Sequence, residues 1–292
     1  MNVQFHSMNV ALACELGANA ALLFENILFW VEKNRVNDKG FYDGRYWTYN
    51  SRQAIKVLFP YMTQDQLRTA FDKLKDNDFI LISKNKRGGS DRTLWYAITD
   101  KGYAFIKESR MKHDLPYQHV NVSFATKYGV SAAVLLENII YWTKYNKDNH
   151  TNYYDDYYWT YNTLQALNGL FPYISKRSIS ASLHKLEDLG FIKIGNYNSN
   201  PLDKTPWYTV TEKGVKVFQD AEEYPVDENA ENALFSTRVQ KSQIESAKIP
   251  NGRCKNPKCL FIFRYTTRYT TRYTNDLLST RVRARECWRQ SA

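Results

Sequence analysis

The chain contains the same sequence design twice. A shift of 112 positions aligns residues 5–106 with residues 117–218 without a gap. Trp47-Thr48-Tyr49-Asn50 falls on Trp159-Thr160-Tyr161-Asn162, and Phe59-Pro60-Tyr61 falls on Phe171-Pro172-Tyr173. A period of this length is typical of duplicated domains rather than of a solenoid built from small units. We call the two copies repeat 1 and repeat 2.

The repeats divide the 292 residues into four predicted segments. Domain 1 is expected over residues 1–108, a linker over 109–116, and domain 2 over 117–219. The remaining residues, 220–292, form a tail whose composition is first acidic and then basic. Arg264, Arg268 and Arg272 recur there within a Tyr-Thr-Thr pattern, and like charges at this spacing disfavour a helix. We expect a disordered tail that binds nucleic acid weakly or is a passenger.

Apolar residues at helical spacing predict a first helix over about residues 19–34, with Asn19 as its N-cap and Ser131 as the equivalent cap in repeat 2. A short aromatic strand follows over residues 46–49. Asn50 then caps a second helix, with Gln53 completing a capping box, and Asn162 with Gln165 repeats this pattern. The sequences of the two repeats therefore predict the same helices and strands.

A helix-turn-helix and a hairpin complete each predicted repeat. The second helix is expected to end at Phe59-Pro60, and a third to begin after Thr63, or after Ser175 in repeat 2. Strand-like residues 79–82 and 93–98 flank Gly88-Gly89-Ser90, which predicts a hairpin. The order helix, strand, helix, turn, helix and hairpin is that of a winged helix. The predicted fold is α+β and mainly helical, with two tandem winged helix-turn-helix domains and a low-complexity basic C-terminal tail.

Each repeat resembles the N-terminal DNA-binding module of replisome-organiser-type replication proteins from phages and plasmids of Gram-positive bacteria. The resemblance rests on the helix segment 23–30, the segment 46–50, Phe59-Pro60, and residues 74–80 leading into Trp95-Tyr96. It covers residues 5–218. It implies a sequence-specific protein that binds double-stranded DNA at a replication origin and recruits replisome proteins such as a helicase or its loader.

Two other functions remain open at this stage. The Thr-x-Lys-Gly ending at residues 99–102 is similar to that of many winged-helix transcription regulators, so the chain could act by occluding a promoter. Alternatively, the two domains could bind a host protein while the tail alone contacts nucleic acid. The location of bound DNA sites separates replication from regulation, and loss of specific binding separates both from the adaptor function.

Helix-turn-helix geometry nominates the residues that face DNA, because the second helix enters the major groove and the wing reaches the backbone or the minor groove. Arg can bond the guanine edge and Gln the adenine edge, whereas Ser, Thr and Lys more often hold phosphates. The candidates of repeat 1 are Gln64, Asp65, Arg68, Thr69 and Lys73 on the helix with Lys84, Lys86, Arg87 and Arg92 around the wing, and those of repeat 2 are Lys176, Arg177, Ser178, Ser180, His184 and Lys185. Because the two faces differ, we expect the repeats to read different half-sites.

The net charge of the chain favours a polyanionic partner. Compared segment by segment, the charges favour repeat 1 as the stronger DNA-binding module. The chain carries 40 Lys and Arg against 30 Asp and Glu, which leaves a net charge of +10. The first wing is basic, whereas the second tip, residues 195–202, carries no charge. Repeat 1 is therefore predicted to bind DNA more strongly. Repeat 2 is expected to bind weakly or to serve as a copy for protein docking or dimerisation.

The remaining residues predict packing rather than chemistry. The tryptophans shared by both repeats are expected in the core, and Tyr153, Tyr154, Tyr157 and Tyr158 are a weaker candidate for a partner surface. The histidines lack metal-ligand spacing, and no phosphate-binding loop is present. We expect a cytoplasmic protein without a membrane segment, with reduced cysteines, and with no enzymatic activity, cofactor or metal.

Overall fold

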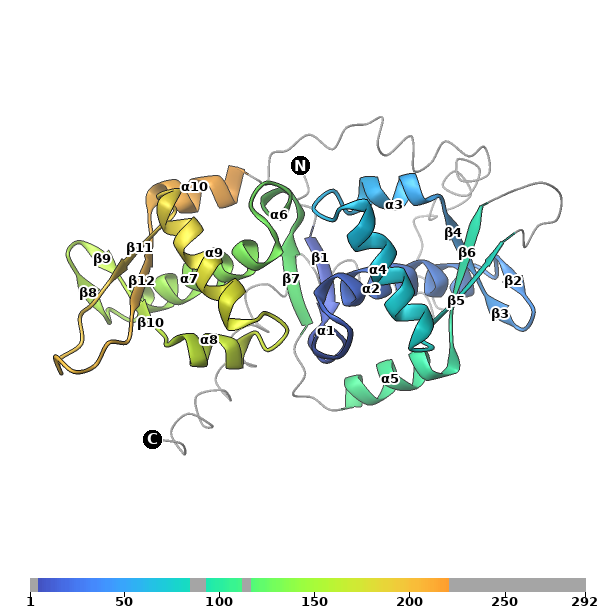
Figure 1. Cartoon of the computed structure of the whole chain (residues 1–292), viewed down its shortest axis with the longest axis horizontal. Helices are drawn as coiled ribbons and strands as arrows, with labels where there is room; N and C mark the ends of the chain where they lie inside the picture. Colours follow the sequence, from blue (N-terminus) through green and yellow to red (C-terminus); the bar gives the residue numbers. More distant parts are fainter. Residues whose placement is uncertain (1–4, 85–92, 112–116, 221–292) are drawn as a thin grey trace, which may run out of the picture.

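The computed structural model describes residues 5–84, 93–111 and 117–220 and shows an α+β, mainly helical chain with small antiparallel sheets (Figure 1). Both repeats contain the same order of elements. Repeat 1 contains β1 (Phe5–Asn9), α1 (Val10–Leu16), α2 (Ala18–Val36), β2 (Phe41–Tyr42), β3 (Arg45–Tyr46), β4 (Thr48–Asn50), α3 (Arg52–Leu58), α4 (Gln64–Asp76), β5 (Ile80–Lys84), β6 (Leu94–Ile98) and α5 (Asp100–Met111). Repeat 2 contains β7 (Tyr117–Asn121), α6 (Val122–Tyr128), α7 (Val130–Asp148), β8 (Tyr153–Tyr154), β9 (Tyr157–Tyr158), β10 (Thr160–Tyr161), α8 (Leu164–Leu170), α9 (Lys176–Asp188), β11 (Ile192–Gly195), β12 (Trp207–Val210) and α10 (Glu212–Asp220).

A three-stranded antiparallel sheet closes each repeat. The strand order is β4-β6-β5 in repeat 1 and β10-β12-β11 in repeat 2, so the strand before the helix pair lies beside the last strand of the hairpin. Ile80 lies opposite Ile98, and Ile192 lies opposite Val210. The predicted pairing of the last two strands is confirmed in both copies. The turn of the first hairpin, with Gly88-Gly89-Ser90, lies outside the described residues.

The predicted caps of the first long helix are wrong. Gly17 and Gly129, rather than Asn19 and Ser131, precede α2 and α7, and neither helix has a side-chain cap. The cause is an unpredicted short helix before each long one. The chain turns sharply from α1 into α2 with a φ of 92° at Gly17 and from α6 into α7 with 97° at Gly129, a conformation that favours glycine.

The cap of the next helix is shifted by one residue from the prediction. Asn50 belongs to strand β4, where it lies opposite Leu94, so it does not cap α3. The Ser51 hydroxyl instead accepts a hydrogen bond from the backbone N–H of Ala54 at 3.1 Å. Thr163, rather than Asn162, does the same in repeat 2. The predicted boxes with Gln53 and Gln165 are therefore wrong.

The predicted start of the third helix is confirmed. Thr63 caps α4 in a reciprocal capping box with Gln66, and Ser175 caps α9. The predicted buried face is also confirmed, because Leu67, Phe71 and Leu74 are buried on α4 and their equivalents are buried on α9. The side chains on the opposite face of each helix are consequently left to solvent.

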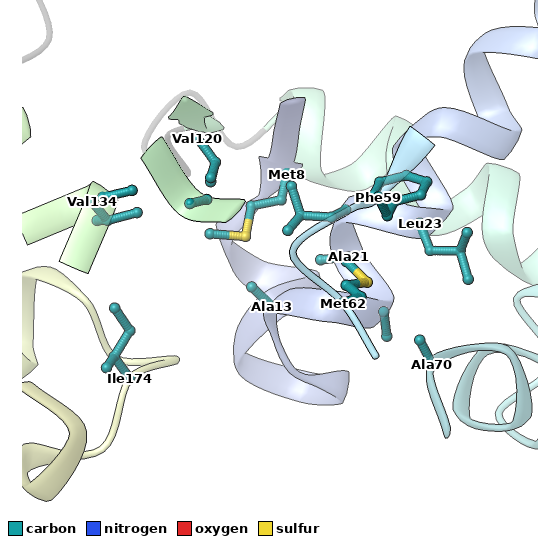
Figure 2. Close-up of a cluster of buried hydrophobic side chains, with 14 of the residues drawn as sticks. Met8, Ala13, Ala21, Leu23, Phe59, Met62, Ala70, Val120, Val134 and Ile174 are labelled. Carbon is teal, nitrogen blue, oxygen red and sulfur yellow. The ribbon is translucent and has the colours of Figure 1, made fainter. Parts of the chain in front are cut away.

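An unpredicted strand pair joins the two repeats. Strands β1 and β7 run antiparallel beside each other at the centre of the molecule (Figure 1). One cluster of buried side chains extends across this junction and includes residues of both repeats. Figure 2 shows Met8 of repeat 1 between Phe59 of its own repeat and Val120 and Val134 of repeat 2. The buried core is therefore continuous between the repeats.

Half-buried polar side chains form hydrogen-bonded pairs along this junction. His6 Nδ1 lies 2.6 Å from the Tyr61 hydroxyl, and Ser7 Oγ lies 2.9 Å from His119 Nδ1. Burial lowers the pKa of His6 to about 4 and lowers the pKa of His119, because desolvation disfavours the imidazolium form. Both histidines are thus neutral near pH 7.

Candidate nucleic-acid interface

The turn between α3 and α4 is held by buried apolar residues and by one lysine. Phe59 and Met62 are buried, which fixes the turn against the core. Lys56 Nζ donates hydrogen bonds to the carbonyls of Pro60 at 3.0 Å and Met62 at 2.5 Å. In repeat 2, the Asn168 side chain donates to the Ile174 carbonyl at 2.8 Å. The angle between the two helices is therefore set by contacts at the turn in both copies.

The candidate side chains at the start of α4 are exposed, but they are electrostatically balanced. Gln64, Asp65, Arg68 and Thr69 all lie on the exposed side of the helix. Arg68 Nη2 and Asp65 Oδ1 form an ion pair at 3.0 Å, with both side chains largely in solvent. Asp65 therefore offsets the one arginine that the first turns of this helix offer to a phosphate or a guanine.

The start of α9 carries uncompensated positive charge. Lys176, Arg177 and Ser178 are exposed, and within the described residues neither cation has an ion pair. Ser178 is engaged locally, since its hydroxyl lies 2.9 Å from that of Ser175 and its N–H donates to Ser175 Oγ. Ser180 is half-buried. The free charge therefore lies on Lys176 and Arg177.

Three further side chains that were predicted to contact DNA interact with neighbouring groups of the protein. Lys73 Nζ donates to the Leu16 carbonyl, and Lys185 Nζ donates to the Tyr128 carbonyl, each at 2.9 Å. Each lysine thus bonds the last carbonyl of α1 or α6, where a cation also favours the helix dipole. His184 Nδ1 lies 3.8 Å from Glu187 Oε2 on the exposed surface of α9. The DNA contacts predicted for these three side chains stay predictions.

The structure describes the two hairpins predicted to be wings to different extents. Lys84 is exposed at the end of β5, whereas Lys86, Arg87 and Arg92 lie outside the described residues. The wing of repeat 2 is held by Asn198, whose side chain donates to the carbonyls of Asp203 and Thr205 and accepts from Trp207 Nε1 at 2.8 Å. The tail residues Arg264, Arg268 and Arg272 also lie outside the described residues.

The charges at the starts of α4 and α9 rank the repeats in the opposite order from the charge predicted for whole segments. The repeat offset makes Asp65 equivalent to Arg177 and Gln64 equivalent to Lys176. The exposed start of α9 is therefore more positive than that of α4. The opposite ranking, which relied on the basic wing of repeat 1, stays a prediction because that wing is not described.

Most of the tryptophans shared by the two repeats lie in the buried core. Trp47, Trp95, Trp159 and Trp207 are buried, as predicted, whereas Trp30 and the equivalent Trp142 are half-buried. The tyrosine segment of repeat 2 forms the small β8–β9 hairpin, in which Tyr153 and Tyr154 are exposed and Tyr157 and Tyr158 are half-buried. Tyr154 stacks on Tyr197 of the wing with ring centroids 4.7 Å apart. This contact ties the hairpin to the wing.

At the start of each repeat, sequence reasoning missed a strand and a short helix, which are β1 and α1 in repeat 1 and β7 and α6 in repeat 2. A usable signal was present, since Asn9 and Asn121 stand at equivalent positions and are followed by short apolar segments that end at Gly17 and Gly129. The Asn9 side chain accepts from the Leu12 N–H at 3.2 Å, and the Asn121 side chain accepts from the Phe124 N–H at 2.9 Å. An N-cap and a glycine stop thus bracket each short helix.

The part of the chain that the structure describes has neither a metal-binding cluster nor a membrane-spanning helix. Within residues 5–84, 93–111 and 117–220, no group of three or more His, Cys, Asp or Glu side chains could hold a metal ion. No helix in the same ranges has the length and apolar character needed to cross a membrane. Comparison of the chain with models of known protein families and with curated proteins finds no match.

Proposed function

We propose that this chain is a sequence-specific double-stranded DNA-binding protein built from two winged-helix modules, with α4 and α9 as the recognition helices. The observation that carries the proposal is the arrangement around each helix pair. A short strand, two helices joined by a fixed turn, and an antiparallel hairpin that pairs back to that strand occur in both repeats. In such units the second helix enters the major groove and the hairpin contacts the backbone.

The exposed side chains support DNA as the ligand. Lys176 and Arg177 stand at the start of α9, where recognition helices approach base edges and phosphates. Arg68 and Gln64 occupy the corresponding region of α4. The net charge of +10 favours association with a polyanion. The buried faces of both helices are apolar, so these polar residues are available for recognition.

The biological setting that we propose is replication of phage or plasmid DNA. This part of the proposal rests on the resemblance of residues 5–218 to the DNA-binding module of replisome-organiser proteins, which implies recognition of an origin and recruitment of a helicase or its loader. A transcription regulator would use the same DNA-binding surface. The two functions differ in where the bound sites lie in the genome.

The test is a selection of bound fragments from the source genome with the full chain at about 150 mM salt, where non-specific electrostatic binding is weak. We expect one enriched locus, with repeated sites beside an AT-rich segment. A site over a promoter would replace the replication role by regulation. No enriched locus would exclude sequence-specific binding and favour the protein adaptor.

Point variants locate the binding surface. Arg177→Ala removes an exposed cation at the start of α9, and we expect a loss of about 1–3 kcal/mol in binding to the selected site. Lys144→Ala is the matched control, because Lys144 is also exposed but lies on α7. An equal effect of the two variants would show that α9 has no special place in binding.

A further inference from the structure

The two repeats are related by a two-fold rotation, and the strand pair between them reveals its axis. Ser7 lies opposite His119, which is its own equivalent in repeat 2. On either side, Phe5 lies opposite Asn121 and Asn9 lies opposite Tyr117. Position 117 is equivalent to position 5, and position 121 to position 9, so each contact occurs twice with the partners exchanged. This reciprocity is the signature of an isologous interface.

The arrangement of the helices follows the same rotation. In Figure 1, α3 lies at the upper right and α8 at the lower left, while α5 lies at the lower right and α10 at the upper left. A half turn about the line of sight exchanges these pairs. Helices α4 and α9 are both drawn in front, α4 over α2 and α9 over α7. The two candidate recognition helices therefore lie on one face of the molecule.

The junction between the repeats is built to keep this relationship fixed. Met8 and Val120 are fully buried at the junction, and the apolar cluster to which they belong continues into both repeats. The Ser7–His119 hydrogen bond lies at the axis. A close-packed interior resists sliding, because displacement would open voids or force clashes. The spacing and the relative direction of α4 and α9 are thus properties of the fold.

From this geometry we infer that the chain binds one DNA duplex as a covalently linked pseudo-dimer, with α4 and α9 on the two arms of an inverted repeat. The inference rests on the proposed function and adds the geometry of its target. A duplex presents equivalent major-groove surfaces related by two-fold axes, and a two-fold protein engages them in inverted orientation. Direct repeats are related by translation along the duplex, so a two-fold pair would fit only one of them at a time.

The arms of this inverted repeat differ in sequence. The start of α4 presents Asp65 with its ion-paired Arg68, whereas the start of α9 presents Lys176 and Arg177. An acidic side chain repels phosphates and can accept only from a donor such as the cytosine amino group, whereas Arg favours guanine. Of the two helix starts, that of α9 should therefore contribute more to affinity and to salt dependence, and that of α4 should contribute selectivity.

The experiment uses the full chain and synthetic duplexes that carry the two arms found by footprinting the selected fragment. The first comparison reverses one arm, so that the inverted repeat becomes a direct repeat of the same composition. The second inserts 5 base pairs, about half a helical turn, between the arms. We expect each change to weaken binding about tenfold or more. Equal affinity for the direct repeat, or tolerance of the insertion, would overturn the inference while leaving DNA binding intact.

Two exposed substitutions assign each helix to an arm. Arg177→Ala should reduce protection of one arm and Arg68→Ala of the other, whereas Lys144→Ala should leave both unchanged. Loss of protection on the same arm in both variants would overturn the pseudo-dimer. If the full chain selects no DNA sequence, the proposed function fails and this inference fails with it. The two failures are therefore distinguishable.

Discussion

Leu74 of repeat 1 and Leu186 of repeat 2 occupy equivalent positions and are both fully buried, whereas Asp65 and Arg177, also equivalent, are exposed and opposite in charge. At these positions the two repeats share the same buried residue but differ in the residue that they expose to solvent. Interiors tolerate change poorly because packing is dense, but an exposed side chain can change without altering the fold. What differs between the repeats is therefore the better guide to their separate roles.

The largest expected effect tests the shared interior. Leu74→Ala and Leu186→Ala each remove a fully buried side chain, and we expect each to lower the free energy of unfolding by about 2–5 kcal/mol. Urea denaturation monitored by circular dichroism measures the loss. Because the core is continuous across the strand pair, both variants should unfold in one transition. Two separate transitions would show that the repeats are independent in stability.

Leu202→Ala is the control for these core variants. Leu202 is 85% exposed in the wing of repeat 2, so its removal leaves no cavity. We expect a change within about 0.5 kcal/mol. A loss as large as that of Leu186→Ala would mean that the wing packs against something other than the described core.

The second effect concerns the junction, where His6 in repeat 1 is equivalent to Gln118 in repeat 2. The pKa of the half-buried His6 falls from 6.5 to about 4 because desolvation penalises its charged form. The neutral form therefore stabilises the fold fully above about pH 6.5, and this contribution is lost as the pH falls towards 4. The full loss corresponds to about 3 kcal/mol.

His6→Gln places the residue of repeat 2 in repeat 1 and should remove this part of the pH dependence. The comparison is the urea midpoint at pH 7 and at pH 4.5 in the original chain and in the variant. His119, whose pKa is also lowered by burial, remains in both proteins and contributes equally. An unchanged loss of stability on acidification would show that His6 is not the group responsible.

A third and smaller effect separates a true helix cap from an apparent one. The buried Asn9 side chain accepts from the Leu12 N–H and donates to Ser109 Oγ at 3.0 Å, so Asn9→Ala should cost about 1–2 kcal/mol. Asn19 lies inside α2 and makes no cap, so Asn19→Ala should cost nothing, since Ala is the better helix former. Thermal denaturation compares the two. A larger loss for Asn19→Ala would reverse the assignment.

These asparagines also illustrate what the sequence could predict. Apolar spacing predicted the long helices α2 and α7 and the helices α4 and α9, because their buried faces repeat every three to four residues. Thr63 and Ser175 were predictable as caps, since each stands directly before such a pattern and after a proline turn. Asn19 and Asn50 failed because suitable cap residues also occur inside helices and strands, where their neighbours decide.

The pairing of β1 with β7 and the relative orientation of α4 and α9 could not be predicted from the sequence, for a different reason. Strands β1 and β7 are five residues each and lie 112 positions apart, so no local pattern reports their pairing. The candidate DNA-facing residues at the start of α4 and α9 followed from helical geometry. The partners of Lys73 and Lys185 did not, because they are carbonyls of helices that had not been predicted.

The smallest expected effect tests whether the surface difference between the repeats matters for DNA. Asp65→Asn removes the negative charge that pairs with Arg68 and that repeat 2 replaces by Arg177. Because exposed ion pairs contribute little to stability, the urea midpoint should hardly move. Affinity for the selected DNA should rise by about two- to fivefold, since a charge that repels phosphate is gone and Arg68 is released.

Asp76→Asn provides the matched control, because Asp76 is exposed on the same helix but at its other end. The two variants change the net charge equally, so a general electrostatic effect would raise the affinity of both alike. A rise confined to Asp65→Asn places DNA at the start of α4, as a recognition helix requires. If the affinity rises in both variants, or in neither, the start of α4 does not contact DNA. In that case α9 alone would enter the major groove, and repeat 1 would have only a structural role.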